Sequence, residues 1–289
     1  MICNLCPRRC GALRTDTEGQ GFCGMPAQPV AARAGLLHWE EPSISGTNGS
    51  GAVFFSGCVL RCIFCQNSQI SRDNFGKTIS VPRLREIFLE LIAQGAHNIN
   101  LVSPTPFALA VREALEEPLP VPVVWNTGGY ERVETLMALE GRVQIWLPDL
   151  KYADSAMAKA YSSAEDYFPV ATAAIQEMYR QVGDYVIEDG MLKSGVLIRH
   201  LLLPGGLQNT KAVLDWVAET FKPGQVLFSL MAQYTPQPWA EGLLKRRVTK
   251  AEYRAAAEYM ENLGIVEGYS QDKSSAKAEY TPLFDLSGL

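Results

Sequence analysis

Short apolar runs divide the chain from about residue 50 onward. Six of these runs have strand character, at residues 52–56, 98–103, 121–126, 143–147, 196–203 and 226–231. Runs that are apolar at nearly every position are typical of parallel strands buried on both faces. Because helical segments separate them, the pattern predicts an α/β fold in which βα units with right-handed crossovers build a parallel sheet.

The segments between the predicted strands carry helical signals. Helices are expected at residues 82–94, from 209 to about 222 and at 250–262, with two more inside the insertion 152–194. The first has Ser80 as a plausible N-cap, and the third begins with the capping-box pattern Thr249-x-x-Glu252. Residues 42–51 hold three glycines among small polar residues and predict a loop.

Composition excludes several classes of protein. Hydrophobic residues make up 47% and charged residues 20% of 289 residues, which provides a sizeable core and excludes wholesale disorder. The net charge of −5 gives no reason to expect direct nucleic-acid binding. Neither a membrane-spanning apolar run nor a signal-peptide pattern is found, so a soluble cytoplasmic protein without a membrane partner is expected.

All seven cysteines lie within the first 65 residues. They are Cys3, Cys6, Cys10, Cys23, Cys58, Cys62 and Cys65. An odd number of cysteines without a secretory signal argues against a disulfide framework. In a reducing compartment, cysteines at this density are usually ligands of zinc or iron.

Three cysteines follow the first predicted strand as Cys58-x3-Cys62-x2-Cys65. Three thiolates can hold three corners of a cubane iron–sulfur cluster and leave one iron without a protein ligand. A closed zinc site or a closed electron-transfer cluster takes four ligands instead. The spacing therefore predicts a [4Fe–4S] cluster with one coordination position open to another molecule.

The other four cysteines form the set Cys3-x2-Cys6-x3-Cys10-x12-Cys23. Residues 1–24 are too few and too polar to fold around a core of their own, and a bound metal would stabilise them. Four thiolates can complete a tetrahedral zinc site or hold a second [4Fe–4S] cluster. The spacing leaves both metals open and predicts a structural or electron-relay role.

The Cys58–Cys65 motif, with Phe64 before its last cysteine, resembles the cluster loop of the radical S-adenosylmethionine (radical SAM) superfamily. The resemblance implies a partial (β/α)6 TIM-like barrel, in agreement with the six strands. It also implies that S-adenosylmethionine binds the open iron and is cleaved reductively to a 5′-deoxyadenosyl radical, which takes a hydrogen atom from the substrate. Phe64 would then lie near the adenine, with a packing role in the core as the alternative.

The resemblance is closer to an uncharacterised group related to pyruvate formate-lyase activating enzymes, and it covers nearly the whole chain. The segments that carry it are 6–10, 21–24, 38–42, 44–46, 54–58, 98–105, 125–127, 147–151, 198–200, 231–234 and 280–285. We divide the chain accordingly into a Cys-rich module (1–45), the barrel core (46–235) and a C-terminal helical extension and tail (236–289).

Polar residues near the ends of the predicted strands are candidate cofactor or substrate ligands, because sites of such folds lie at the carboxyl ends of the strands. The candidates are Ser103, Thr105, Asn126, Thr127, Asp149, Lys151, Arg199 and Gln233. Ser103 and Thr105 stand where the superfamily has Gly-Gly-Glu, so hydroxyls or carbonyls would replace a carboxylate there; a rigid proline turn is the alternative.

Arg199 lies inside an apolar strand, and a buried arginine requires an anion. Under the resemblance this anion is the carboxylate of S-adenosylmethionine, with a structural ion pair as the alternative. Asp149 and Lys151 resemble the Asp-Leu-Lys of the activating enzymes but also suit a solvated pair. His200 has the opposite strand parity and is expected to pack or to lie at the surface, whereas Glu40 and Glu41 are expected in a solvated loop.

Three functions remain open. The protein is an activase that abstracts hydrogen from a glycine of a glycyl-radical enzyme, or a radical lyase or rearrangement enzyme acting on a small metabolite or modified base, as queuine lyase does. A non-catalytic iron–sulfur or zinc electron carrier is the third. The first two require an external one-electron reductant such as flavodoxin or ferredoxin.

Overall fold

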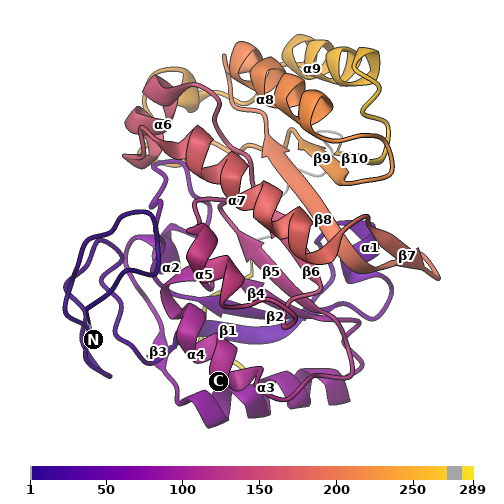
Figure 1. Ribbon diagram of the computed structural model, residues 1–289. Coiled ribbons are helices and arrows are strands. Elements are labelled where there is room, and N and C mark those ends of the chain that lie inside the picture. Colours follow the sequence, from indigo (N-terminus) through magenta and orange to yellow (C-terminus); the bar gives the residue numbers. More distant parts are fainter. Residues whose placement is uncertain (1, 272–281) are drawn as a thin grey trace.

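The computed structural model describes residues 2–271 and 282–289, and its centre is a ten-stranded sheet in the order β10-β9-β8-β6-β5-β4-β2-β1-β3, with β7 beside β8 (Figure 1). The strands β2 (Ser50–Phe55), β4 (Ile99–Val102), β5 (Val123–Thr127), β6 (Ile145–Pro148), β8 (Met191–Leu201), β9 (Leu227–Met231) and β10 (Gly268–Gln271) are parallel. The strands β1 (Val30–Leu37), β3 (Lys77–Thr78) and β7 (Val186–Glu188) pair antiparallel.

The six predicted strands are β2, β4, β5, β6, β8 and β9, and they are contiguous in the sheet. The sheet does not close on itself in the described residues, because β3 and β10 end its order at opposite edges. The predicted α/β fold with an open, partial barrel is therefore confirmed.

Helices connect the parallel strands. They are α3 (Val81–Ala93), α4 (Ala108–Ala114), α5 (Val133–Met137), α6 (Ser155–Ser162), α7 (Tyr167–Val182), α8 (Leu207–Thr220) and α9 (Lys250–Asn262), with the single turns α2 (Ser68–Ser71), η1 (Thr105–Phe107) and η2 (Gly242–Lys245). The Ser80 hydroxyl accepts from the Arg83 amide at the start of α3, and Thr249 and Glu252 form the predicted capping box of α9. Two helices occupy the 152–194 insertion, as expected.

Strand alternation divides the core into an outer layer and an inner one. Trp125 and Trp146 belong to the large cluster under the helices, with their rings 6.1 Å apart. Their neighbours Val124 and Leu147 face the barrel interior instead, where they pack with Ile44. Ile44 belongs to α1 (Pro42–Ser45), which contacts β8 and closes one end of the interior.

The expectation of a loop over residues 42–51 was wrong at both ends. Residues 42–45 form α1, which has a proline in its first turn, and β2 begins at Ser50. The Asn98 side chain donates to the Ile44 carbonyl at 2.7 Å and so holds α1 beneath the start of β4. The burial of Ile44 in the barrel interior stabilises this helical turn, although the three glycines of the segment favour a loop.

The flanking segments are hydrogen-bonded into the core. The strand β1, inside predicted segment 1–45, pairs with β2, and β10, inside segment 236–289, pairs with β9. Residues 282–289 run beside β1, where the Leu286 amide donates to the Ala32 carbonyl at 3.0 Å. Part of the family-like segment 280–285, namely residues 280 and 281, lies outside the described residues.

No helix in the described parts of the chain is both long enough and apolar enough to cross a membrane.

Candidate metal and cofactor site

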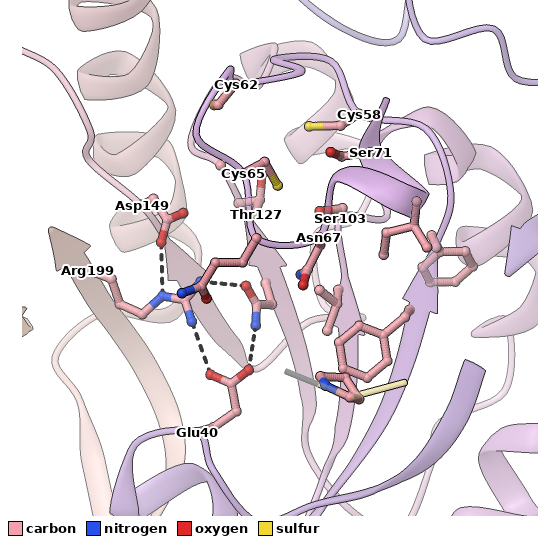
Figure 2. Close-up of a pocket in the computed structure, with 18 of the residues that line it drawn as sticks. Glu40, Cys58, Cys62, Cys65, Asn67, Ser71, Ser103, Thr127, Asp149 and Arg199 are labelled. Carbon is pink, nitrogen blue, oxygen red and sulfur yellow. Dashed lines mark hydrogen bonds and ion pairs between the residues drawn. The ribbon is translucent and has the colours of Figure 1, made fainter. Parts of the chain in front are cut away.

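The loop with the three cysteines leaves the carboxyl end of β2, as the sequence predicts. It starts at Gly57, whose φ is +75° and whose position leaves no room for a side chain: a Cβ there would lie 2.2 Å from Met25 Cγ. Only glycine allows this backbone conformation and this close approach together. Cys58, Cys62 and Cys65 follow on one tight loop above the cavity (Figure 2).

A cavity of about 560 Å³ lies between this loop and the barrel interior. Ten of the predicted site residues line it: Cys58, Cys62, Cys65, Ser103, Asn126, Thr127, Asp149, Lys151, Arg199 and Gln233. They come from the ends of β2, β4, β5, β6, β8 and β9, which meet at one edge of the sheet. The strand-end rule therefore brought together side chains up to 175 residues apart in sequence, from Cys58 to Gln233.

Arg199 lies at the centre of an ion-pair network on the wall of this cavity (Figure 2). Its Nε donates to Asp149 Oδ1 at 3.0 Å, one Nη donates to Glu40 Oε2 at 3.0 Å, and the other donates to Asn126 Oδ1 at 2.6 Å. The Asn126 amide also donates to Glu40 Oε1 at 3.1 Å, and Lys151 Nζ lies 2.5 Å from Asp149 Oδ2. The network links β5, β6 and β8 to the segment before α1.

The pKa values of the two carboxyl groups of the network, Glu40 and Asp149, shift in opposite directions. Burial raises the pKa of Glu40 to about 7; Arg199 opposes this rise, whereas Glu41 and Asp149 add to it. Burial would raise the pKa of Asp149 as well, but Arg199 and Lys151 together hold it below its ordinary value. Asp149 has two cations against it and Glu40 has one, so only Glu40 is poised to exchange a proton near neutral pH.

The structure corrects the interpretation of Glu40 and Glu41 as residues of a solvated loop. The Glu40 side chain is 13% exposed and ion-paired, and Glu41 is buried. The structure also gives Arg199 two carboxylate partners, Glu40 and Asp149. This is the structural ion pair that the sequence analysis kept as the alternative to a cofactor carboxylate. Three of the five guanidinium N–H groups take part in this network, and a bond from Arg199 to a cofactor carboxylate stays a prediction.

Ser103 and Thr105 have different surroundings. Ser103 lines the cavity with a φ of +58°, a conformation that non-glycine residues adopt mainly where the fold constrains them. Thr105 is buried outside the cavity lining, where its hydroxyl donates to Glu131 Oε1 at 2.5 Å. Thr127 donates to the same oxygen at 2.5 Å, as does the Trp125 indole at 3.3 Å.

Glu131 is thus a buried carboxyl that the sequence analysis did not identify. Burial raises its pKa, and the three donors oppose that rise. Its position four residues beyond Thr127 was the available signal, because the end of β5 had already been singled out. Glu131 connects the ends of β4 and β5 and engages the Thr105 hydroxyl within the protein, so a cofactor role for Thr105 stays a prediction.

Phe64 does not lie at the cavity either. Its ring meets Tyr152, Tyr161 and Tyr234 edge-on, with centroids 6.0–6.4 Å apart. Edge-to-face packing of this kind is typical of a hydrophobic core, and Phe64 is 7% exposed. The Phe64 ring therefore packs in the core, and proximity of Phe64 to an adenine stays a prediction.

His200 packs on the outer face of β8, as strand alternation predicts. It is fully buried, and its ring nitrogens contact the Leu150 carbonyl at 2.6 Å and the Thr210 hydroxyl at 2.8 Å. Burial lowers the pKa of His200 to about 4. The imidazole is therefore neutral and structural.

The segment with the N-terminal cysteines contacts the loop that carries Cys58, Cys62 and Cys65, here called the triad loop, through Arg8 and Arg61. Cys3, Cys6 and Cys23 are buried, and Cys10 is exposed. Burial raises the pKa of Cys6 to about 12, and Cys23 and Cys3 add to the rise. All seven cysteines are free, so no disulfide competes for either set.

The sulfur positions bear on which metal each set suits. A zinc ion holds its thiolates at about 2.3 Å and so draws them to one point. In the described ranges, no three histidine, cysteine or acidic side chains converge in that way. A cubane cluster places each thiolate on a separate iron.

Fold and site together define an α/β protein with a cysteine-rich cavity at the carboxyl edge of an open parallel sheet. No protein-family model matches the sequence. Uncharacterized protein MJ0674 of Methanocaldococcus jannaschii is 29% identical over 275 residues, which cover 91% of this chain and 75% of that protein.

Two solved structures also resemble the chain. Methylornithine synthase (PylB) is 14% identical with a TM-score of 0.49, over 74% of this chain and 68% of that one. SuiB of Streptococcus suis, bound to S-adenosylmethionine, is 10% identical with a TM-score of 0.47, over 74% of this chain. The match spans about half of SuiB's length, 48%.

Proposed function

We propose that this protein is a radical SAM enzyme. The observation that carries the proposal is the loop with three cysteines at the carboxyl end of β2, which opens onto a cavity lined by polar groups from five further strands. When bound, a [4Fe–4S] cluster and S-adenosylmethionine would supply an electron and a cleavable sulfonium bond, and so a 5′-deoxyadenosyl radical.

The residues present fit these groups. Cys58, Cys62 and Cys65 are the candidate ligands of the cluster, and two hydrogen bonds to their sulfurs support thiolate ligation: the Leu60 amide donates to Cys58 Sγ at 3.4 Å and the Ser162 hydroxyl to Cys62 Sγ at 3.0 Å. Ser103, Asn126, Thr127, Asp149, Lys151, Arg199 and Gln233 remain the candidate ligands of S-adenosylmethionine or the substrate.

The test is the release of 5′-deoxyadenosine and methionine by anaerobically reconstituted protein after addition of dithionite. We expect release by the wild type, none by Cys62→Ala, and none by the wild type without reductant. A reducible cluster without cleavage would fit the electron-carrier alternative and overturn the proposal. Flavodoxin or ferredoxin would replace dithionite physiologically.

As the source of the hydrogen atom that the radical takes, we propose a small polar molecule in preference to a glycine of a partner enzyme. The support is the enclosed network of Glu40, Asn126 and Arg199 on the cavity wall, which offers hydrogen bonds within the barrel and not on an outer surface. Faster 5′-deoxyadenosine release with the small-molecule fraction of an anaerobic extract would support this. Release only with a glycyl-radical enzyme, together with a glycyl radical in its EPR spectrum, would establish the activase alternative.

We also propose that Cys3, Cys6, Cys10 and Cys23 bind a second metal centre, with a [4Fe–4S] cluster ahead of zinc. The Cys6-Pro7 pair, which resembles the cysteine–proline pairs of ferredoxin loops, favours the cluster. Metal analysis of the Cys58/Cys62/Cys65 triple-alanine variant tests this. About four irons per chain would support the second cluster; one zinc would identify a zinc site, and no metal would refute the proposal.

A further inference from the structure

Ser162 is the last residue of α6, and its side chain is directed at a cysteine of the triad. Its hydroxyl donates to Cys62 Sγ at 3.0 Å, and the residue is 3% exposed. The Tyr152 hydroxyl lies 2.8 Å from Ser162 Oγ and 4.0 Å from Cys62 Sγ. With the Ser162 proton on the sulfur, Ser162 Oγ can accept from the Tyr152 hydroxyl, which gives the order Tyr152 to Ser162 to Cys62.

The helix that carries Ser162 is fixed at both ends. At its start, Asp154 Oδ1 accepts from the Ala156 and Met157 amides at 2.8 and 3.0 Å. At its end, the Arg8 guanidinium donates to the Ser162 carbonyl at 2.6 Å. The last carbonyls of a helix lack partners within the helix, and a cation is favourable at that end of the helix dipole.

The triad loop is tied to the same end of α6. Arg8 Nε donates to the Val59 carbonyl at 2.7 Å, and the Ile63 amide donates to the Tyr161 carbonyl at 2.9 Å. Val59 and Ile63 flank Cys62 within the loop. These bonds fix the Ser162 hydroxyl against the sulfur, so the short contact is a consequence of how the helix is docked.

We propose that Ser162, oriented by Tyr152, is a positioning residue that sets the reduction potential of the cluster on Cys58, Cys62 and Cys65; this inference rests on the proposed function. Reduction adds negative charge to the cluster and its thiolates, and a hydrogen bond to a ligand sulfur stabilises that charge. The donor chain therefore raises the potential and makes the one-electron reduction easier. Tyr152 strengthens the inner bond because hydrogen bonds in a chain polarise one another.

The test is a potentiometric titration of the reconstituted full-length protein, followed by EPR of the reduced cluster. Ser162→Ala is expected to shift the midpoint to a more negative value, and to lower the ratio of reduced to oxidised cluster at a fixed potential by about tenfold, because one hydrogen bond to a charged group is removed. Ser162→Thr keeps the hydroxyl and should restore the wild-type value. Tyr152→Phe should shift the midpoint in the same direction by less.

Ser155→Ala, at the exposed start of the same helix, is the matched control and should leave the midpoint unchanged. Iron and sulfide content is measured for each variant, so that a shift is assigned only to proteins with equal loading. If the Ser162→Ala variant loses the cluster, the midpoint potential of the Tyr152→Phe variant decides whether the inference holds. An unchanged midpoint in the fully loaded variants would overturn this inference alone, whereas a wild type that binds no cluster at the triad would overturn the proposed function as well.

Discussion

Replacing Glu40 with glutamine is expected to change the pH dependence of protein stability. The pKa of Glu40 is about 7 in the folded protein against an ordinary value of 4.5. The folded state therefore binds one more proton than the unfolded state between these values. The stabilisation is complete below pH 4.5 and is lost as the pH rises through 7. At 1.36 kcal/mol for each pH unit, this amounts to about 3 kcal/mol in all, most of it between pH 5 and pH 8.

Glutamine resembles the protonated carboxyl in shape and does not titrate. Relative to Glu40→Gln, the wild-type free energy of unfolding is expected to fall by about 2 to 3 kcal/mol from pH 5 to pH 8. Urea unfolding followed by tryptophan fluorescence, on samples of equal metal content, gives this quantity. Glu258→Gln, at an exposed position on α9, should keep the wild-type pH dependence. A constant difference between Glu40→Gln and wild type across this range would refute the assignment of a buried, proton-exchanging carboxyl.

Three further substitutions test contacts around the cavity by urea unfolding. Glu131→Ala leaves three buried donors without their acceptor and should lower the free energy of unfolding by about 2 to 4 kcal/mol. Gly129→Ala places a methyl group 2.1 Å from the Asp149 carbonyl oxygen at a φ of +80° and should lower it by at least about 2 kcal/mol. Asn209→Leu removes the acceptor of two backbone amides and should lower it by about 2 kcal/mol. Values within about 0.5 kcal/mol of wild type would contradict each argument.

The parallel core could be predicted because each of its strands is apolar on both faces, so local sequence and final environment agree. The strand β1 was missed although seven of its eight residues are apolar or glycine, whereas two other missed strands lack that agreement. The β10 sequence is Gly-Tyr-Ser-Gln, and β3 is an exposed Lys-Thr pair; both are strands because of their neighbours and not because of their own residues. The helix α1 was missed for a related reason, since four residues give no periodicity to read.

The strand-end rule located much of the candidate site, but it could not supply the partners. Strand parity set Arg199 and His200 on opposite faces of β8, and in the structure Arg199 lines the cavity while His200 contacts Thr210 of α8. The partner Glu40 is 159 residues away in sequence and lies outside any predicted strand, so no local rule connects it to Arg199. Phe64 is a second example: its motif position gave no sign of the three tyrosines that pack edge-on around its ring.

The two cysteine sets are joined by reciprocal arginine contacts. Arg8, between Cys6 and Cys10, donates to the Val59 carbonyl of the triad loop at 2.7 Å. Arg61, between Cys58 and Cys62, donates to the Phe22 carbonyl beside Cys23 at 3.1 Å. Each loop thus satisfies backbone carbonyls of the other with a charged donor, and such bonds are stronger than neutral ones. The N-terminal segment, which cannot fold by burial alone, therefore takes its position from the triad loop and in turn fixes that loop. A metal bound at either set would stabilise the conformation that the other set requires.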